Sequence, residues 1–161
     1  MIAKNGGTET DVNARIAKAY AAFHKLGRTF RSSNISKKTK IRIFKACVKP
    51  VLLYGSETWK TTEAVSRKLQ VFVNSCLRKI LKIFWPNTIS NEQLWLLTES
   101  KPIAQDILER KWRWIGHTLR KPDNDIAKMA FEYNPQGNRR RGRPKMTWKR
   151  SVLNESKHIG S

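Results

Sequence analysis

Residues 61–86 read TTEAVSRKLQVFVNSCLRKILKIFWP, with an apolar side chain at every third or fourth position. This spacing places a single apolar stripe on one face of an α-helix, made of Val65, Leu69, Phe72, Cys76, Ile80 and Ile83. Thr61 or Thr62 can cap the start of the helix, and Pro86 is expected to end it. The stretch therefore predicts one long amphipathic helix.

The same period recurs on both sides of this helix. It predicts a helix over about residues 8–30, then one from Ser36 to about residue 52 that Pro50 should kink or interrupt. Further helical segments are expected at 93–98, at 103–119 and, capped by Asp123 or Asn124, up to about residue 133. The stripe expected to be buried on 103–119 is Ala104, Leu108, Trp112, Ile115 and Leu119, widened by Ile103, Ile107 and Trp114. No useful alternating strand pattern exists, so the predicted fold class is all-α.

Composition points to a folded protein with a polyanionic partner. The chain has 161 residues, 33 Lys plus Arg against 12 Asp plus Glu, a net charge of +21, 39% hydrophobic residues and six Trp. One domain or two small ones with a sizeable core are expected. Nucleic acid is the first candidate partner and an anionic membrane surface the second, since self-repulsion on this scale needs compensation. No apolar run is long enough to span a bilayer, so no membrane insertion is expected.

Charge is concentrated at the two ends of the chain. Residues 1–60 carry thirteen basic and three acidic side chains, residues 61–134 twelve and eight, and residues 135–161 eight and one. From Val12 to Ser56 there are eleven Lys or Arg and no carboxylate. On the expected helix within this region, Lys38, Arg42, Lys45 and Lys49 step by four, three and four, which aligns them as one cationic stripe for phosphates. A lysine-rich solvated face is the other interpretation.

The second basic region is the tail after Asn134, an expected extended linker followed by a short helix from Thr147 through Leu153. Its candidate nucleic-acid-binding residues are Arg139, Arg140, Arg141, Arg143, Lys145 and Trp148, the last offering a stacking face. The run Arg141-Gly142-Arg143-Pro144 contains the core of an AT-hook, whose Gly and Arg suit a narrow minor groove. A nuclear-localisation run or a phosphate-binding linker without sequence preference would have the same composition.

Nothing in the sequence predicts catalysis, a metal site or a cofactor. Asp123 and Asp125 are better explained as helix caps than as a Mg²⁺ pair, because no third carboxylate accompanies them. Cys47 and Cys76 fall at apolar helical positions and are expected to be buried free thiols of a reducing compartment, without zinc-ligand spacing. The expected location is intracellular and nuclear.

An ordered series of motifs carries a family resemblance. It consists of Asp11-Val12-Asn13-Ala14-Arg15-Ile16-Ala17-Lys18-Ala19, Ile35-Ser36-Lys37-Lys38-Thr39-Lys40-Ile41-Arg42-Ile43-Phe44, Val51-Leu52-Leu53-Tyr54-Gly55-Ser56-Glu57-Thr58-Trp59, Trp112-Arg113-Trp114-Ile115-Gly116-His117-Thr118-Leu119-Arg120 and Arg141-Gly142-Arg143-Pro144-Lys145-Met146-Thr147-Trp148. In this order the motifs resemble the region after the palm in the endonuclease-reverse transcriptases of non-LTR (LINE-type) retrotransposons. The resemblance covers essentially the whole chain.

The resemblance implies a helical thumb-like bundle, a small helical region and a basic extended tail. The expected organisation is thumb-like helices following the palm at 1–60, a C-terminal helical region at 61–134 and a basic nucleic-acid-binding tail at 135–161. The family performs RNA-directed DNA polymerisation, but its catalytic aspartates would lie before Met1. The chain is therefore expected to be inactive alone, with Mg²⁺ implied only for the parent polymerase, an upstream palm as a partner, and a truncated or decayed element copy as its origin.

Three interpretations remain open. The first is a reverse-transcriptase fragment that grips phosphates of RNA, an RNA-DNA hybrid or DNA. The second is a non-enzymatic DNA-binding adaptor that uses the AT-hook-like tail. The third is a pseudogene product with no selected function, which does not fold stably without its palm.

Overall fold

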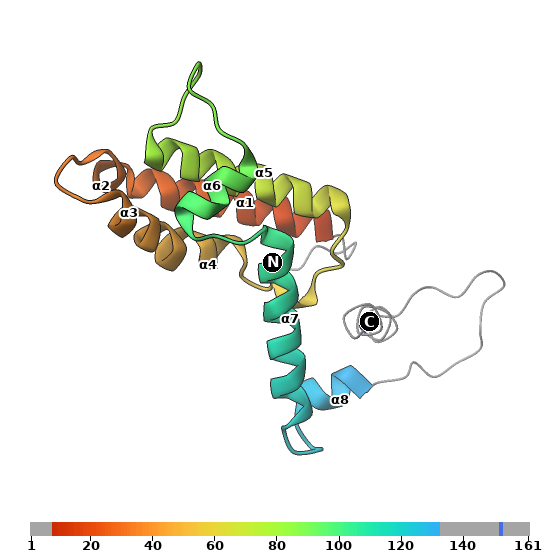
Figure 1. Ribbon diagram of the computed structural model, residues 1–161. Helices are drawn as coiled ribbons and strands as arrows, with labels where there is room; N and C mark the ends of the chain where they lie inside the picture. The colour runs from red at the N-terminus through yellow and green to blue at the C-terminus, as the bar shows by residue number, and fades with distance from the viewer. Residues whose placement is uncertain (1–7, 133–151, 153–161) are drawn as a thin grey trace. The chain divides into compact units, whose positions relative to one another are not determined.

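Helices account for the regular structure of the described residues, 8–132 and Val152, in the computed structural model shown in Figure 1. No strand occurs in this part of the chain, so the predicted all-α class is confirmed. The chain divides into two compact units, Met1–Trp112 and Arg113–Ser161. The first unit extends across residue 60, where the sequence placed a domain boundary. None of the described helices is long and apolar enough to cross a membrane.

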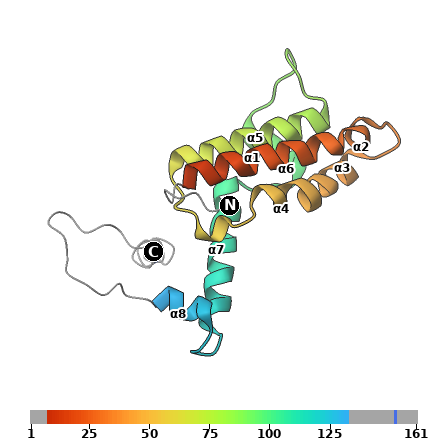
Figure 2. The same ribbon diagram turned by 180° about the vertical axis from the view of Figure 1, so that it is seen from behind.

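Two long helices form the frame of the first unit, α1 (Thr8–Lys25) and α5 (Glu63–Leu81). They lie side by side and run in the same direction, as Figures 1 and 2 show from opposite sides. The chain returns between them through short elements: α2 (Gly27–Arg31), α3 (Lys37–Ile43), the π-helix η1 (Phe44–Val48), α4 (Lys49–Leu52) and the 3₁₀-helix η2 (Ser56–Thr58). The helices α6 (Asn91–Thr98) and α7 (Ile103–Leu119) follow α5.

Capping side chains set the starts of these helices. The Ser36 hydroxyl accepts from the Thr39 N–H at 3.1 Å at the start of α3, and Thr62 accepts from Val65 N–H at 3.3 Å at the start of α5. Both caps agree with the sequence expectation. The expected helix 8–30 is interrupted at Leu26, which separates α1 from α2. The predicted long helix ends earlier than expected, because Lys82 adopts the left-handed conformation at φ 59° after Leu81.

Pro50 has the interrupting effect that the sequence predicted. Proline has no N–H to donate to the carbonyl of Ala46, and its ring would clash with that carbonyl in a regular α-helix. The turn before it widens instead into the π-helix η1. One inserted residue rotates everything after it by roughly 100° relative to α3. Side chains on either side of η1 therefore do not share one straight stripe.

The core of the first unit is apolar and aromatic. The Phe23 and Phe30 rings stack with centroids 4.8 Å apart, and Phe44 meets Phe23 edge-on at 6.3 Å. The side chains with no exposed surface include Val12, Val48, Leu52, Leu53, Leu69, Leu77 and Leu94. The helix α5 contributes the largest buried stripe, so the long amphipathic helix is also the centre of the packing.

A buried amide joins α5 to α6 and to the start of α7. Asn74, only 4% exposed, accepts at Oδ1 from Gln70 Nε2 at 2.8 Å and from Trp95 Nε1 at 3.0 Å. Its own Nδ2 donates to Asn91 Oδ1 at 3.0 Å. Gln70 in turn accepts from the Ile103 backbone N–H at 2.7 Å. The network satisfies a buried polar group and fixes where α6 lies.

The predicted buried face of α7 is confirmed at Ile103, Ile107 and Ile115 and wrong at the other positions of the predicted stripe. The buried side chains are Ile103, Ile107, Lys111, Ile115 and Thr118, while Leu119 is 47% exposed and Ala104, Leu108 and Trp112 are not fully buried. The observed stripe steps mostly by four. It includes Lys111 and Thr118, which a search for apolar residues at helical spacing does not find.

The second unit begins within α7 and includes α8 (Ile126–Glu132). The cap of α8 is Asp125, which accepts from the Ala127 N–H at 2.9 Å, so the capping role expected of Asp125 is confirmed, whereas the cap predicted at Asp123 or Asn124 is wrong. The candidate binding residues of the tail, Arg139, Arg140, Arg141, Arg143, Lys145 and Trp148, lie outside the described residues.

The two cysteines are free, but only one of them is buried. Burial raises the pKa of the Cys76 thiol to about 12, which outweighs the opposing charge of Lys79. Cys47 is exposed, contrary to the sequence expectation, because η1 turns it away from the apolar face.

We therefore expect one reactive thiol in the folded chain. A thiol-specific disulfide reagent should modify Cys47 within minutes and leave Cys76 unmodified until denaturant is added. The Cys47→Ser variant should give no fast reaction. Two fast-reacting thiols in the native protein would contradict the placement of Cys76.

Replacing Asn74 tests how much its hydrogen-bond network contributes to the stability of the fold. Asn74→Ala should lower the free energy of unfolding by about 2–3 kcal/mol, since it leaves the half-buried Trp95 N–H and Gln70 amide without their acceptor. The matched control is Ser75→Ala, an exposed neighbour on the same helix, which should change it by less than about 0.5 kcal/mol. Urea denaturation followed by circular dichroism measures both, and equal effects would contradict a special role for Asn74.

Candidate nucleic-acid interface

The helix α3 presents cations to solvent on one side and closes the core on the other. Lys37, Lys38 and Arg42 are exposed, whereas Ile41 and Lys40 are buried. The Lys40 ammonium donates to the Ser32 carbonyl at 2.5 Å, so this lysine holds the loop before α3. The exposed cations of α3 therefore lie on a face that Lys40 does not share.

The predicted stripe of four cations divides into two pairs. Lys38 and Arg42 precede η1 and are exposed, as expected. Lys45 lies within η1, and its ammonium donates to the carbonyls of Thr98 at 2.8 Å and Glu99 at 2.6 Å. Lys49, after η1, forms an ion pair of 2.6 Å with Asp106 in a half-buried position. The structure thus leaves Lys38 and Arg42 exposed, whereas the ammonium groups of Lys45 and Lys49 are held by partners within the protein.

The Lys45 ammonium caps the C-terminal end of α6. The last carbonyls of a helix lack intrahelical partners, and a cation there is also favoured by the helix dipole. Burial lowers the pKa of Lys45, and the nearby charge of Lys49 acts in the same direction, against the opposing effects of Glu99 and Asp106. An ammonium held in this way contributes to folding more than to phosphate binding.

A groove of about 380 Å³ lies beside the exposed pair, and we call it the α3 groove. Its cations are Lys37, Lys38, Arg42 and Lys45, and its apolar residues are Ile41, Leu81, Ile83 and Leu97. Glu99 is the single carboxylate among its lining residues. The α3 groove is therefore cationic with an apolar component.

A second groove, of about 510 Å³, lies between α1, α2 and the end of α5, and we call it the aromatic groove. Its lining residues are Phe23, His24, Gly27, Phe30, Arg31, Lys79, Lys82 and Phe84, with no carboxylate among them. Directly after it in the chain comes Trp85, 87% exposed. The sequence patterns did not identify this groove, although the run Lys79 to Trp85 combines cations with aromatic residues.

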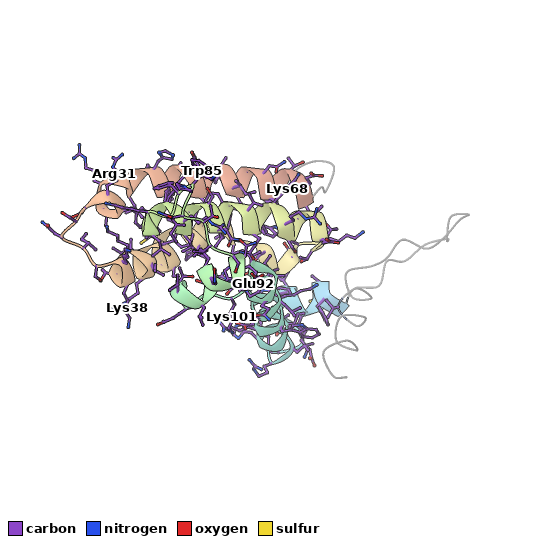
Figure 3. The ribbon with its side chains drawn as sticks, turned by 45° about the horizontal axis from the view of Figure 1, so that its top comes forward. Arg31, Lys38, Lys68, Trp85, Glu92 and Lys101 are labelled. Carbon is purple, nitrogen blue, oxygen red and sulfur yellow. The ribbon has the colours of Figure 1, made fainter. Side chains whose placement is uncertain are left out.

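The two ends of the frame formed by α1 and α5 differ in whether their cations form ion pairs. At the start of α1 and α5, Glu9 pairs with Lys68, and Glu63 with Arg67 at 2.7 Å. At the other end no ion pair within residues 8–132 involves Arg31, Lys38 or the other exposed cations of the two grooves. Figure 3 shows Arg31 and Lys38 toward one end and Lys68 toward the other. One end of the first unit is thus a cationic surface whose exposed groove cations form no ion pair within residues 8–132, with Glu99 as the single carboxylate lining the two grooves.

The described residues contain no cluster of side chains that could bind a metal ion. No group of three or more His, Cys, Asp or Glu side chains gathers in residues 8–132. Asp123 and Asp125 instead form ion pairs with Lys128 at 2.5 Å and Lys121 at 3.1 Å. These lysines, with the cap of α8, account for both carboxylates.

Comparison with known proteins points to a transposable element. Residues 22–54 match a family described as a domain of unknown function, DUF6451, and this segment includes α2 and α3. Over 150 residues the chain is 27% identical to a Caenorhabditis elegans protein named "Putative uncharacterized transposon-derived protein". The match covers 90% of this chain and 53% of that protein, so the chain spans about half the length of this curated relative. No solved structure matches significantly.

The inward orientation of Lys45 has a measurable consequence. Lys45→Ala should lower the free energy of unfolding by about 1.5–3 kcal/mol, because it removes a charged donor from two helix-terminal carbonyls. Lys38→Ala, on the exposed face of α3, should change it by less than about 0.5 kcal/mol. Urea denaturation of the two variants measures the difference. If Lys45→Ala is as stable as Lys38→Ala, the two hydrogen bonds contribute nothing measurable.

Proposed function

We propose that this chain is a nucleic-acid-binding part of a transposon-encoded reverse transcriptase of the non-LTR type. Its exposed cations hold the phosphates of a template-primer or of RNA. The observation that carries the proposal is the cationic end of the first unit, where Lys38 and Arg42 are exposed on α3 without an ion pair within residues 8–132, and the sequence has no carboxylate from Val12 to Ser56.

Electrostatics favour a polyanion at this surface. Lys38 and Arg42 are one helical turn apart, a spacing at which like charges destabilise a helix by about 0.2–0.5 kcal/mol. Phosphates placed along α3 reverse the sign of that interaction and release counterions. The ion pairs Glu9–Lys68 and Glu63–Arg67 show that the fold neutralises cations elsewhere with its own carboxylates.

Two observations support the proposal, one for the assignment to reverse transcriptases and one for the transposon origin alone. The first is the ordered series of motifs that resembles the region after the palm of the non-LTR enzymes, one of which lies on α3 and another around η2. The second is the similarity to a transposon-derived protein. The proposal gives the chain the role of holding nucleic acid, while the family's catalytic aspartates belong to a palm outside the resemblance.

A second candidate function has its own observation, the run Arg141-Gly142-Arg143-Pro144. In a DNA-binding adaptor this tail would enter the minor groove of AT-rich duplex, and the helices would contribute no specificity. The two functions differ in which residues control binding.

Salt dependence of binding tests the proposal. With the full chain and an RNA-DNA hybrid, the double variant Lys38→Gln/Arg42→Gln should bind about tenfold more weakly at moderate salt. The slope of log affinity against log salt should fall by about 2, because each removed cation leaves one phosphate with its counterions. The matched control is Lys60→Gln/Arg67→Gln, which removes two exposed cations from the opposite end and should change the slope far less. Fluorescence anisotropy at several salt concentrations measures both.

Two results would reject the phosphate-holding role of α3. One is an equal loss of affinity in both double variants, which would show unspecific charge attraction. The other is binding confined to AT-rich duplex and abolished by Arg141→Ala/Arg143→Ala alone, which would establish the adaptor.

A further inference from the structure

We propose that the aromatic groove is a second nucleic-acid site, which takes a single-stranded segment and stacks a base on Phe84. The phosphates of that segment lie against Arg31, Lys79 and Lys82. This inference rests on the proposed function, because it assumes a nucleic-acid partner, and it adds the strandedness of the ligand and the residues that recognise it.

The groove has the size and the aromatic surface for a base. Its volume of about 510 Å³ lies within the range of ordinary ligand pockets. Phe23 and Phe30 are buried and mutually stacked, so they are held by the core. Phe84 is 60% exposed and lines the same groove from the segment after α5. An aromatic face left open to solvent on a groove is what a nucleobase stacks against in sequence-tolerant single-strand binding.

The charges of the groove are complementary to phosphates. Three cations line it, and no carboxylate does. Within the part of the chain that the structure describes, no ion pair involves Arg31, Lys79 or Lys82. The Lys79 ammonium lies 5.6 Å from the centroid of the Tyr20 ring, which keeps it at the surface between α1 and α5.

The exposed aromatic residues favour a single-stranded ligand over a duplex. Bases in a duplex are stacked on one another and offer only their edges, whereas an unpaired base exposes its whole face. Phe84 is followed directly by Trp85, and both are largely exposed in a segment that carries Lys82. A purely phosphate-binding surface would gain nothing from these two rings, and exposing them to water is unfavourable.

Gly27 provides a way to close the groove without changing its charge. A Cβ built at Gly27 would lie 3.7 Å from the nearest Arg31 guanidinium nitrogen, an ordinary van der Waals contact, and would meet no backbone. The residue begins α2 and does not have a positive φ. A Cβ there is therefore compatible with the backbone, and a leucine side chain would extend from it into space that a base would need.

Three probes of equal length separate the contributions of base and phosphate. We would measure binding of the full chain to an oligouridylate of about 12 nucleotides, to the same backbone without bases, and to an RNA-DNA hybrid. Wild type should bind the oligouridylate about tenfold more tightly than the abasic strand. Phe84→Ala should abolish this preference, and Gly27→Leu should weaken oligouridylate binding by about tenfold. Both variants should bind the hybrid within about twofold of wild type.

The matched control is Leu96→Ala, an exposed apolar residue outside the aromatic groove, which should change none of the three affinities. Phe84→Tyr, which keeps an aromatic face, should retain the preference for bases. Thermal unfolding of each variant confirms that it is folded, and if Phe84→Ala is not, Gly27→Leu decides.

The inference is overturned by equal binding of the oligouridylate and the abasic strand, or by competition from polyglutamate as strong as that from the oligouridylate. If hybrid binding then still depends on Lys38 and Arg42, the proposed function stands without this second site. If wild type binds none of the three probes, both proposals are rejected.

Discussion

The side-chain amide of Asn74 is the contact on which the arrangement of the cations depends. By accepting from Gln70 and Trp95 and donating to Asn91, it fixes α6 against α5, and Gln70 extends the link to the start of α7. The guanidinium of Arg78, one turn further along α5, donates to the same Asn91 oxygen at 2.8 Å and reinforces the link. A buried polar group in the core thus fixes two helices at once.

The position of these helices determines which lysines remain on the surface. Once α6 is fixed, its terminal carbonyls lie where Lys45 can reach them, and Asp106 on α7 lies where Lys49 can reach it. Lys40 is a third internal donor, to the Ser32 carbonyl, and each of these contacts offsets part of the cost of burying a charge. The exposed cations of the two grooves, among them Arg31, Lys38 and Arg42, form no ion pair within residues 8–132. Under the proposed function, phosphates would compensate their charge from outside the chain.

Periodicity was enough to predict the all-α class, the caps Ser36 and Thr62, and the interruption by Pro50, since each depends on neighbours in sequence. It was not enough to predict the consequence of that interruption. The stripe Lys38, Arg42, Lys45 and Lys49 assumes an unbroken helix, but Lys49 follows the inserted turn of η1, and the Lys45 ammonium, although it lines the α3 groove, is held by the carbonyls at the end of α6. Two members of the buried stripe of α7, Lys111 and Thr118, were missed because neither is apolar and their burial depends on tertiary packing. The aromatic groove was missed for the same reason: it combines Phe23 and Arg31 with Lys79 and Phe84, which lie far apart in the chain.

The segment after α5 connects the two grooves. Leu81 and Ile83 line the α3 groove, whereas Lys82 and Phe84 line the aromatic groove, so consecutive side chains of one short segment face two different concavities. The left-handed conformation of Lys82 ends α5 at this point and makes the alternation possible. The two grooves thus share this stretch of backbone as a common wall. A nucleic acid that is duplex on one side and single-stranded on the other would satisfy both, with phosphates along α3 and an unpaired base on Phe84. That geometry belongs to the end of a primed template, which joins the two proposals through one physical feature of the fold.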